Sequence, residues 1–357
     1  MIISDRIDSL DWLRGLMAMS VMIYHLISWN NVYQDSSNLM SRLAIGGVSI
    51  FFILSGLCIS IVYKNFALKT STCIQFYLTR IFRIWPLLWA VTFLLILLQF
   101  LSVGEINYSF KDIVLNISTL FGFVKPSGTF ITGAWSIGNE MVYYAFTPFV
   151  IYLYKCRLYL GNLFLLITLG ISLYFAFFIL NSQQNLDKQW EQYINPLNNF
   201  CLFVLGVAMY FNFNKIEINS KINLTLLVIS LILFIYLPFK GDQINLVSGI
   251  GRIVFIILYF LIVFCFYKMK NRLPFYLNRL LYTIGLVTFG IYMLHPIVKG
   301  YTTFFIKLWF NSYNINHSHP LIIVFVCILT ILISTLSYFY FEIRIIQIGK
   351  KITAKYF

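Results

Sequence analysis

The sequence predicts an all-α polytopic membrane protein with about ten transmembrane helices and both termini in the cytoplasm. Of its 357 residues, 60% are hydrophobic and only 11% are charged, whereas a soluble domain carries about 25% charged residues. The mean hydropathy of +0.83 excludes a disordered chain. The apolar runs are continuous rather than alternating, which excludes a membrane β-barrel and indicates helices.

A helix that crosses the membrane needs roughly 20 mostly apolar residues. The chain contains ten such runs, and the run at 197–213 is the shortest. They cover residues 11–30, 44–63, 83–103, 134–154, 160–180, 197–213, 222–238, 246–267, 280–300 and 321–341. No small-residue cleavage site follows the first run, so we expect it to remain as a span and not to be removed as a signal peptide.

The basic residues predict the orientation. With both termini inside, 17 of the 26 Lys and Arg residues lie in inner loops or tails, 7 in outer loops, and Arg14 and Arg252 within spans. Cytoplasmic loops are enriched in Lys and Arg, so this favours an even number of spans. The same rule explains the net charge of +14 without a nucleic-acid partner. No linker or repeat divides the chain, so we expect one transmembrane domain over 1–357 and no appended soluble domain.

The longest predicted outer loop, 104–133, begins with a capping-box pattern at Ser109–Asp112. Phe110, Ile113, Val114 and Ile117 follow at helical spacing. Two interpretations remain open for this segment: a short helix in the membrane interface or an ordinary surface loop.

Ionisable residues within spans are costly and therefore mark a functional site by default. At 1.5 Å per residue, His25 and His295 lie roughly 21 Å above the inner boundary, and Glu140 and Arg252 lie about 10 Å below the outer one. In a core about 30 Å thick, these four groups form one layer and predict a buried polar site. Taken singly, Arg14 and Arg252 could also reach the headgroups with their long side chains.

Two spacings add detail. Arg14 and His25 are eleven residues apart, which places them within about 20° on one helix face. Arg80 and Arg83, at the inner end of the third run, share a face if helical and suit phosphate oxygens, although a topological anchor is the alternative. The six cysteines show no metal-ligand or disulfide spacing, so no metal is expected.

Several segments, in order along nearly the whole chain, resemble the acyltransferase 3 family. They are LDWLR at Leu10–Arg14 with His25, GVSIFFILSG at Gly47–Gly56, the R-x-x-R of Arg80 and Arg83, WSIGNE at Trp135–Glu140, IYMLHP at Ile291–Pro296, and YFE at Tyr340–Glu342 before a basic tail. The chain departs from the family pattern at Ser49, where an acidic residue is common, and at Asn139, where a small or apolar residue is more usual.

The resemblance implies an integral O-acyltransferase of the bacterial inner membrane that modifies surface polysaccharides such as O-antigen or exopolysaccharide. It implies acyl-coenzyme A, most often acetyl-coenzyme A, as donor substrate, a carbohydrate acceptor and no tightly bound cofactor. A sugar hydroxyl is a poor nucleophile and needs a base, a role that we assign to His25, which can stay neutral away from water.

The other polar residues receive supporting roles. Glu140 is expected to orient or charge-balance His25, His295 or Arg252 to stabilise the oxyanion, and Arg80 and Arg83, with Arg14, to bind the donor phosphates. A competing hypothesis is a proton-coupled transporter or flippase with the buried charges as a relay. The sequence shows no repeated halves, and an arginine pair has no purpose in a relay, so the enzyme is favoured.

Overall fold

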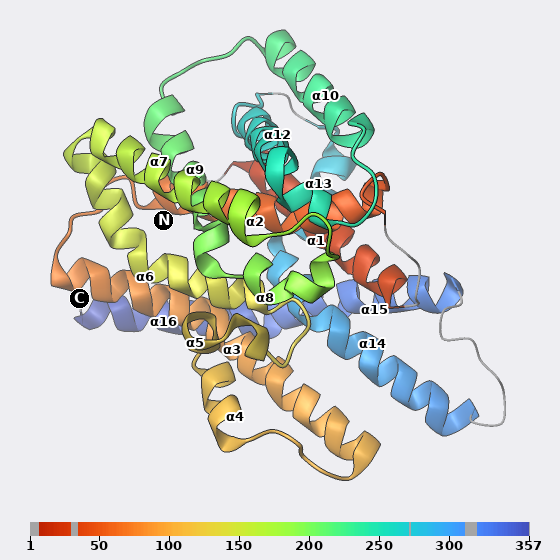
Figure 1. Cartoon of the computed structure of the whole chain (residues 1–357). Coiled ribbons are helices and arrows are strands. Elements are labelled where there is room, and N and C mark those ends of the chain that lie inside the picture. The colour runs from red at the N-terminus through yellow and green to blue at the C-terminus, as the bar shows by residue number, and fades with distance from the viewer. Residues whose placement is uncertain (1–6, 30–34, 271–272, 311–319, 357) are drawn as a thin grey trace. The chain divides into compact units, whose positions relative to one another are not determined.

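Every regular element in the described part of the chain is a helix (Figure 1). The computed structural model describes residues 7–29, 35–270, 273–310 and 320–356. The α-helices are α1 (Asp8–Ser28), α2 (Leu39–Val62), α3 (Thr70–Val103), α4 (Phe110–Ile117), α5 (Phe121–Val124), α6 (Trp135–Cys156), α7 (Leu158–Tyr174), α8 (Trp190–Tyr193), α9 (Pro196–Phe213), α10 (Ser220–Tyr236), α11 (Ile244–Val247), α12 (Gly249–Tyr267), α13 (Phe275–Leu286), α14 (Thr288–Phe310), α15 (Pro320–Ser337) and α16 (Ile343–Tyr356). Two 3₁₀ turns, η1 (Pro126–Gly128) and η3 (Leu186–Gln189), and two π-helical turns, η2 (Phe175–Ile179) and η4 (Tyr338–Glu342), complete the set.

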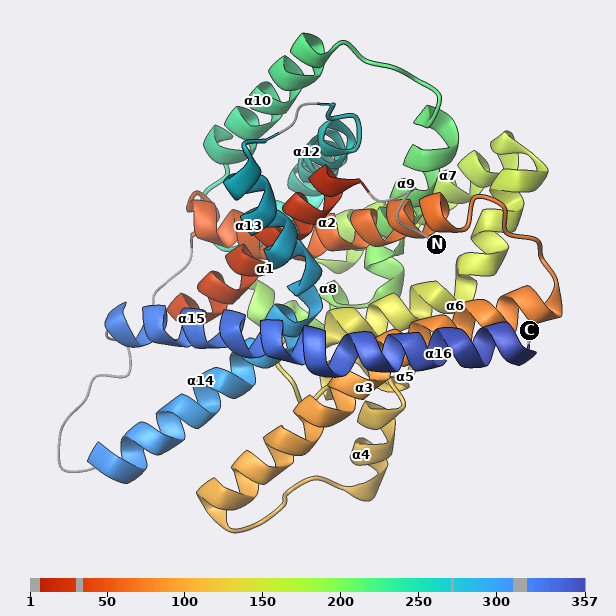
Figure 2. The same ribbon diagram turned by 180° about the vertical axis from the view of Figure 1, so that it is seen from behind.

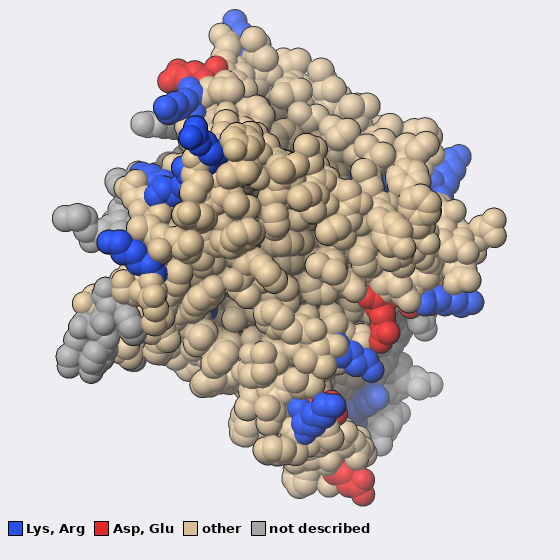
Figure 3. Space-filling view, turned by 60° about the vertical axis from the view of Figure 1, so that its left-hand side comes forward, with Lys and Arg blue, Asp and Glu red and all other residues tan. Residues whose placement is uncertain are grey.

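The chain is an all-helical, multi-pass membrane protein. Among the described residues, six helices are long and apolar enough to cross a membrane, or seven spans if the broken pair α13–α14 counts as one. All ten predicted runs fall on helices, but α1 and α6 do not pass this test and α10 is short. Figure 3 shows a wide surface without Lys, Arg, Asp or Glu, as expected for contact with lipid. The count of ten and the orientation stay predictions.

Several predicted boundaries are wrong. Helix α3 begins at Thr70, 13 residues before the predicted start at 83. These additional residues are stabilised by packing on α16, where Phe82 contacts Gly349. Likewise, the run predicted to end at 341 continues through η4 into α16. The predicted span 280–300 is broken at Val287. Helix α12 starts only at Gly249, because Ser248 has extended backbone angles (φ −117°, ψ 158°) that end the preceding α11.

The chain divides into two compact units. Unit 1 comprises Met1–Val21, Gln34–Lys69 and Val142–Gly285, and unit 2 comprises Met22–Tyr33, Thr70–Met141 and Leu286–Phe357. In unit 1, α2 packs on α9 with Gly56 against the Phe203 carbonyl and Gly206 against the Ile53 carbonyl. Such close backbone contact is typical of helices packed within membranes. In unit 2, α3 packs along α16 and α14, and α14 packs along α15 (Figure 2).

Arg42 differs from its predicted place in an outer loop. It lies in the first turn of α2 with 1% of its surface exposed. Its Nη1 donates to the carbonyls of Phe234 and Ile235 at 2.8 Å, and its Nη2 donates to Leu237 O at 2.5 Å. These carbonyls end α10 and lack intrahelical donors, so Arg42 caps that helix. Of the other basic residues in the topology count, Arg6 and Arg272 lie outside the described residues.

The segment 104–133 contains the short helix that its pattern allowed. Ser109 is the N-cap of α4, and its Oγ accepts a hydrogen bond from the backbone N–H of Asp112 at 3.1 Å. The same hydroxyl donates to Asp112 Oδ2 at 2.6 Å. The predicted helix start is confirmed, and the surface-loop interpretation is wrong for residues 110–117.

Candidate functional site

Two histidines from distant parts of the sequence meet in unit 2. His25, in the last turn of α1, places Nδ1 2.9 Å from Nε2 of His295 on α14. The ring centroids are 5.2 Å apart at an interplanar angle of 14°. With the two nitrogens 2.9 Å apart, the ring centroids can be 5.2 Å apart only if the rings point edge to edge along the hydrogen bond. The two imidazoles therefore lie nearly in one plane. His295 is completely buried, and His25 is partly exposed.

The backbone defines which nitrogen carries each proton. His295 Nδ1 lies 3.0 Å from the carbonyl oxygen of Ile291, and because a carbonyl only accepts, Nδ1 must be protonated. In a neutral ring, Nε2 of His295 is then an acceptor, and Nδ1 of His25 must donate to it. Neutral His25 therefore carries its lone pair on Nε2. This order is assigned from the hydrogen-bond partners.

An indole ring adjoins the histidine pair. Trp29, at the end of α1, lies 5.3 Å from the His25 ring and 5.9 Å from the His295 ring, centroid to centroid. Its plane is within 12° of the first ring and 16° of the second. The exposed fraction of Trp29 is 37%. The His25 ring is therefore bordered by an aromatic surface that is partly accessible.

The first turn of α6 is tied to the same helix as His295. Tyr292 Oη donates to the carbonyl of Gly133 at 3.0 Å and lies 2.8 Å from Ser136 Oγ. Each hydroxyl has one hydrogen, so Ser136 Oγ, which also lies 2.9 Å from the Gly133 carbonyl, can donate to that carbonyl or to Tyr292 Oη but not to both. Gly133 has a φ of +86°, which favours glycine. Glu140 follows one turn later and is half-buried. The hydrogen-bond partner of His25 Nδ1 is His295 and not Glu140, which was expected to orient His25.

Arg80 and Arg83 lie on α3 at the predicted i, i+3 spacing. Arg80 is half-buried with its guanidinium 5.7 Å from the Phe76 ring, and Arg83 is exposed. Arg83 interacts electrostatically with Glu342, a buried residue that also accepts a hydrogen bond from Ser337 at 3.1 Å. The pair forms a cationic face on one helix, as its spacing predicts.

Arg14 and Arg252 belong to unit 1. Arg14 lies on α1, 3.5 Å from Asp11 through Nη1. Arg252 is 1% exposed, and its guanidinium donates to Ser172 Oγ, to the Asn198 carbonyl at 2.8 Å and to Asn199 Oδ1. The hydrogen bonds of Arg252 are thus satisfied inside unit 1. The alternative interpretation, in which the Arg252 side chain extends outward to the headgroups, is wrong.

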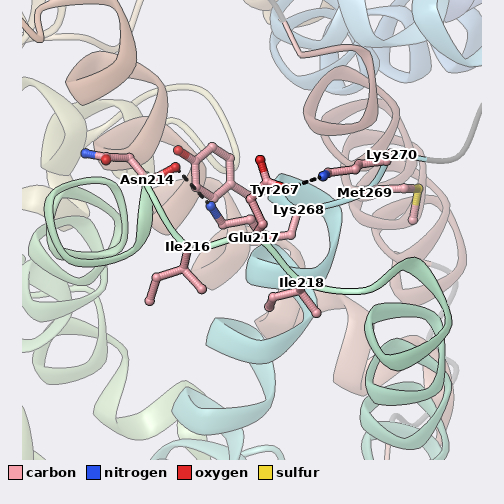
Figure 4. A pocket seen from close by; sticks show the side chains of 8 residues that line it. All are labelled: Asn214, Ile216, Glu217, Ile218, Tyr267, Lys268, Met269 and Lys270. Carbon is pink, nitrogen blue, oxygen red and sulfur yellow. Dashed lines mark hydrogen bonds and ion pairs between the residues drawn. The ribbon is translucent and has the colours of Figure 1, made fainter.

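The ends of α9 and α12 form a small hollow of about 190 Å³, drawn in Figure 4. Lys268 Nζ donates to the Phe213 carbonyl at 2.6 Å, and Lys270 pairs with Glu217 at 3.0 Å. Burial lowers the pKa of Lys268, and the hydrogen bond from Lys270 lowers the pKa of Glu217. Both lysines thus have partners within the protein, and Lys268 caps the C-terminal end of α9. We therefore interpret this hollow as a capped helix end and not as a ligand site.

Comparison with known families decides the class of the protein. The sequence profile of a family described as an acyltransferase domain matches residues 7–339. The chain belongs to the acyltransferase 3 family. It is therefore a membrane acyltransferase of the EC 2.3.1 type. No curated protein and no solved structure matches the chain.

Sequence reasoning missed two parts of this acyltransferase's histidine site. Trp29 follows His25 by four residues, a spacing that places two side chains on one helix face, so its proximity could have been predicted. The bond from Tyr292 to Ser136 could not, because it joins residues 156 positions apart and no periodicity reports such a pairing.

Proposed function

We propose that this acyltransferase moves an acyl group, most often acetyl, from cytoplasmic acyl-coenzyme A to a hydroxyl of a bacterial surface polysaccharide or its lipid-linked precursor. The observation that carries the mechanism is the ordered histidine pair. A neutral His25 with its lone pair on Nε2 is the form that a general base requires. We place the enzyme in the bacterial inner membrane, with acyl donor and acceptor entering from opposite sides.

In the proposed reaction, His25 Nε2 takes the proton from the acceptor hydroxyl as its oxygen attacks the thioester carbonyl. The tetrahedral intermediate then expels the coenzyme A sulfur, and His25 returns the proton to that thiolate. The products are the O-acyl ester and free coenzyme A, with no net proton change. Both nitrogens of His295 already have partners, so we assign it to orienting His25 and not to the oxyanion.

The remaining assignments follow from charge. Arg80 and Arg83 bind the donor phosphates through forked hydrogen bonds, and Arg14 assists from α1. Glu140, one turn after Ser136 on α6, is a positioning residue. The family match gives an acyltransferase and so disfavours the transporter alternative.

The test of this function compares surface glycans of bacterial cells with and without the gene by mass spectrometry. Loss of an acyl mass increment, restored by the wild-type gene but not by His25→Ala, supports the proposal. Identical glycan masses in all strains, with the protein present in the membrane, would assign the activity to another acceptor class.

The donor assignment predicts a binding defect. Arg80→Ala/Arg83→Ala is expected to weaken acyl-coenzyme A binding by at least about 10-fold, since losing even one hydrogen bond to a charged group costs about 1.5–3 kcal/mol. The measurement is calorimetry on purified protein in detergent. The matched control, Lys64→Ala/Lys69→Ala, removes two charges from the same predicted side and should bind normally. Unchanged affinity in the arginine variant would reduce the pair to a topological anchor.

The orientation is tested with reporter fusions. The excess of basic residues in the predicted inner loops predicts that a reporter after Phe357 and one inserted between Lys268 and Arg279 both report the cytoplasm. Opposite signals from the two sites would mean that an odd number of spans separates them, and the count of ten would be wrong.

A further inference from the structure

A row of apolar side chains is exposed on α4 and α5 in unit 2. Phe110 is 82% exposed, and Val114 and Ile117 follow on the same face of α4. Phe123 and Val124 on α5 are exposed by 52% and 65%. An exposed apolar row of this kind needs an apolar partner.

The row continues the exposed apolar surface of a membrane-spanning helix. On α3, Trp89 and Phe93 are both exposed, and Trp89 Nε1 donates to the carbonyl of Ile117, at the end of α4, at 2.7 Å. Trp85, one turn earlier on α3, donates to Thr119 Oγ1 at 3.3 Å. Both indole N–H groups are thus satisfied by the end of α4 and the turn after it, while the Trp89 ring stays exposed beside the row.

Two cations flank this surface. Lys111 lies beside Phe110, and Lys125 follows Val124; both are exposed. Lysine stems cover apolar surface while their ammonium groups reach headgroup phosphates. An amphipathic helix with aromatic residues on one side and lysine at its margin is the pattern of a helix that lies in a membrane interface.

We propose that the bilayer itself covers this surface, so that the apolar row of α4 and α5 contacts lipid as a membrane-docked cap. The continuity with the lipid-facing part of α3 favours lipid over a second protein. This inference uses only the membrane character of the chain and does not depend on the proposed acceptor or base.

The cap is rigidly joined to the first turn of α6. Asn116 Nδ2 donates to the carbonyl of Gly128 at 3.0 Å, and its Oδ1 accepts from the N–H of Phe130 at 2.9 Å. Gly122 packs directly on Gly138, leaving no room for a Cβ on either residue. Docking of the cap in lipid therefore holds the first two turns of α6, which carry Ser136 and Glu140.

Photo-crosslinking tests the occupant. The full-length protein, with p-benzoylphenylalanine in place of Phe110, is reconstituted into vesicles of phosphatidylethanolamine and phosphatidylglycerol, irradiated, and examined by intact mass spectrometry. The expected result is a lipid adduct at position 110 and a much weaker one when the probe replaces Lys111. Absence of lipid adducts at position 110, or a covalent dimer of the chain, would overturn the proposal.

Hydrogen exchange tests the coupling. In the same vesicles, Phe110→Asp/Val124→Asp should increase amide exchange over residues 131–141, because the carboxylates lift the cap from lipid. Asn107→Asp, which adds a carboxylate at an exposed polar position, should leave that exchange unchanged. Unchanged exchange in the double variant would show that docking does not hold α6.

Discussion

His25→Ala is expected to lower acyl transfer by about 10²- to 10⁴-fold, the usual cost of removing a general base. The variant should still insert into the membrane in normal amounts, because alanine is well tolerated within a helical span. It should also bind acyl-coenzyme A normally, since the groups assigned to the phosphates are Arg80 and Arg83 on α3 and Arg14, eleven residues before His25 on α1. The measurement is the initial rate of acyl transfer in membranes, normalised to protein amount.

The control for this change is Ser28→Ala on the same helix. Ser28 Oγ donates to the backbone carbonyl of His25 at 3.2 Å and, among the described residues, contacts neither imidazole ring through a hydrogen bond, so its loss should leave the rate near that of the wild type. Wild-type activity should also fall toward acid pH as His25 takes a proton, because only the neutral ring can accept one from the hydroxyl. Near-normal transfer by His25→Ala would mean that another group is the base.

The sequence predicts the helical membrane class well because hydrophobic composition acts over whole segments. Each of the ten runs lies on a helix. Helix boundaries are less predictable, because an apolar run stops at the edge of the lipid whereas a helix can continue beyond it. Helix α3 extends back to Thr70 because Phe82 and its neighbours pack on α16.

The site shows the same division between local and distant information. His25 and His295 were selected separately because charge is costly within a span, and their calculated depths were similar. The contact between them is a tertiary fact that no local pattern contains. The oxyanion role first assigned to His295 fails for a related reason: the carbonyl of Ile291 occupies its second nitrogen.

Arg42 shows that a charge near the end of an apolar run is ambiguous. Counting placed it in a loop, but the structure buries it in α2 with the terminal carbonyls of α10 as acceptors. Those acceptors are almost 200 residues away in sequence, so only the fold shows that the charge is structural.

The second large effect is expected at His295. Two substitutions there distinguish the loss of the hydrogen bond that orients His25 from the loss of side-chain volume. His295→Leu removes the acceptor for His25 Nδ1–H and should lower the turnover number by on the order of 10²-fold, as misplacement of a reacting group does. His295→Gln retains a carbonyl oxygen near the position of Nε2, which can still accept that hydrogen bond. It should therefore keep substantially more activity than the leucine variant, with little change in the KM for acyl-coenzyme A in either.

Steady-state rates over a range of pH complete this test. Both His295 variants should retain the loss of activity toward acid pH, because His25 is still the group that must be neutral, while their maximal rates differ. Equal rates in the glutamine and leucine variants would contradict the tautomer argument, since only one of them offers an acceptor. Loss of the acid dependence in His295→Gln, with His25 intact, would instead make His295 the base.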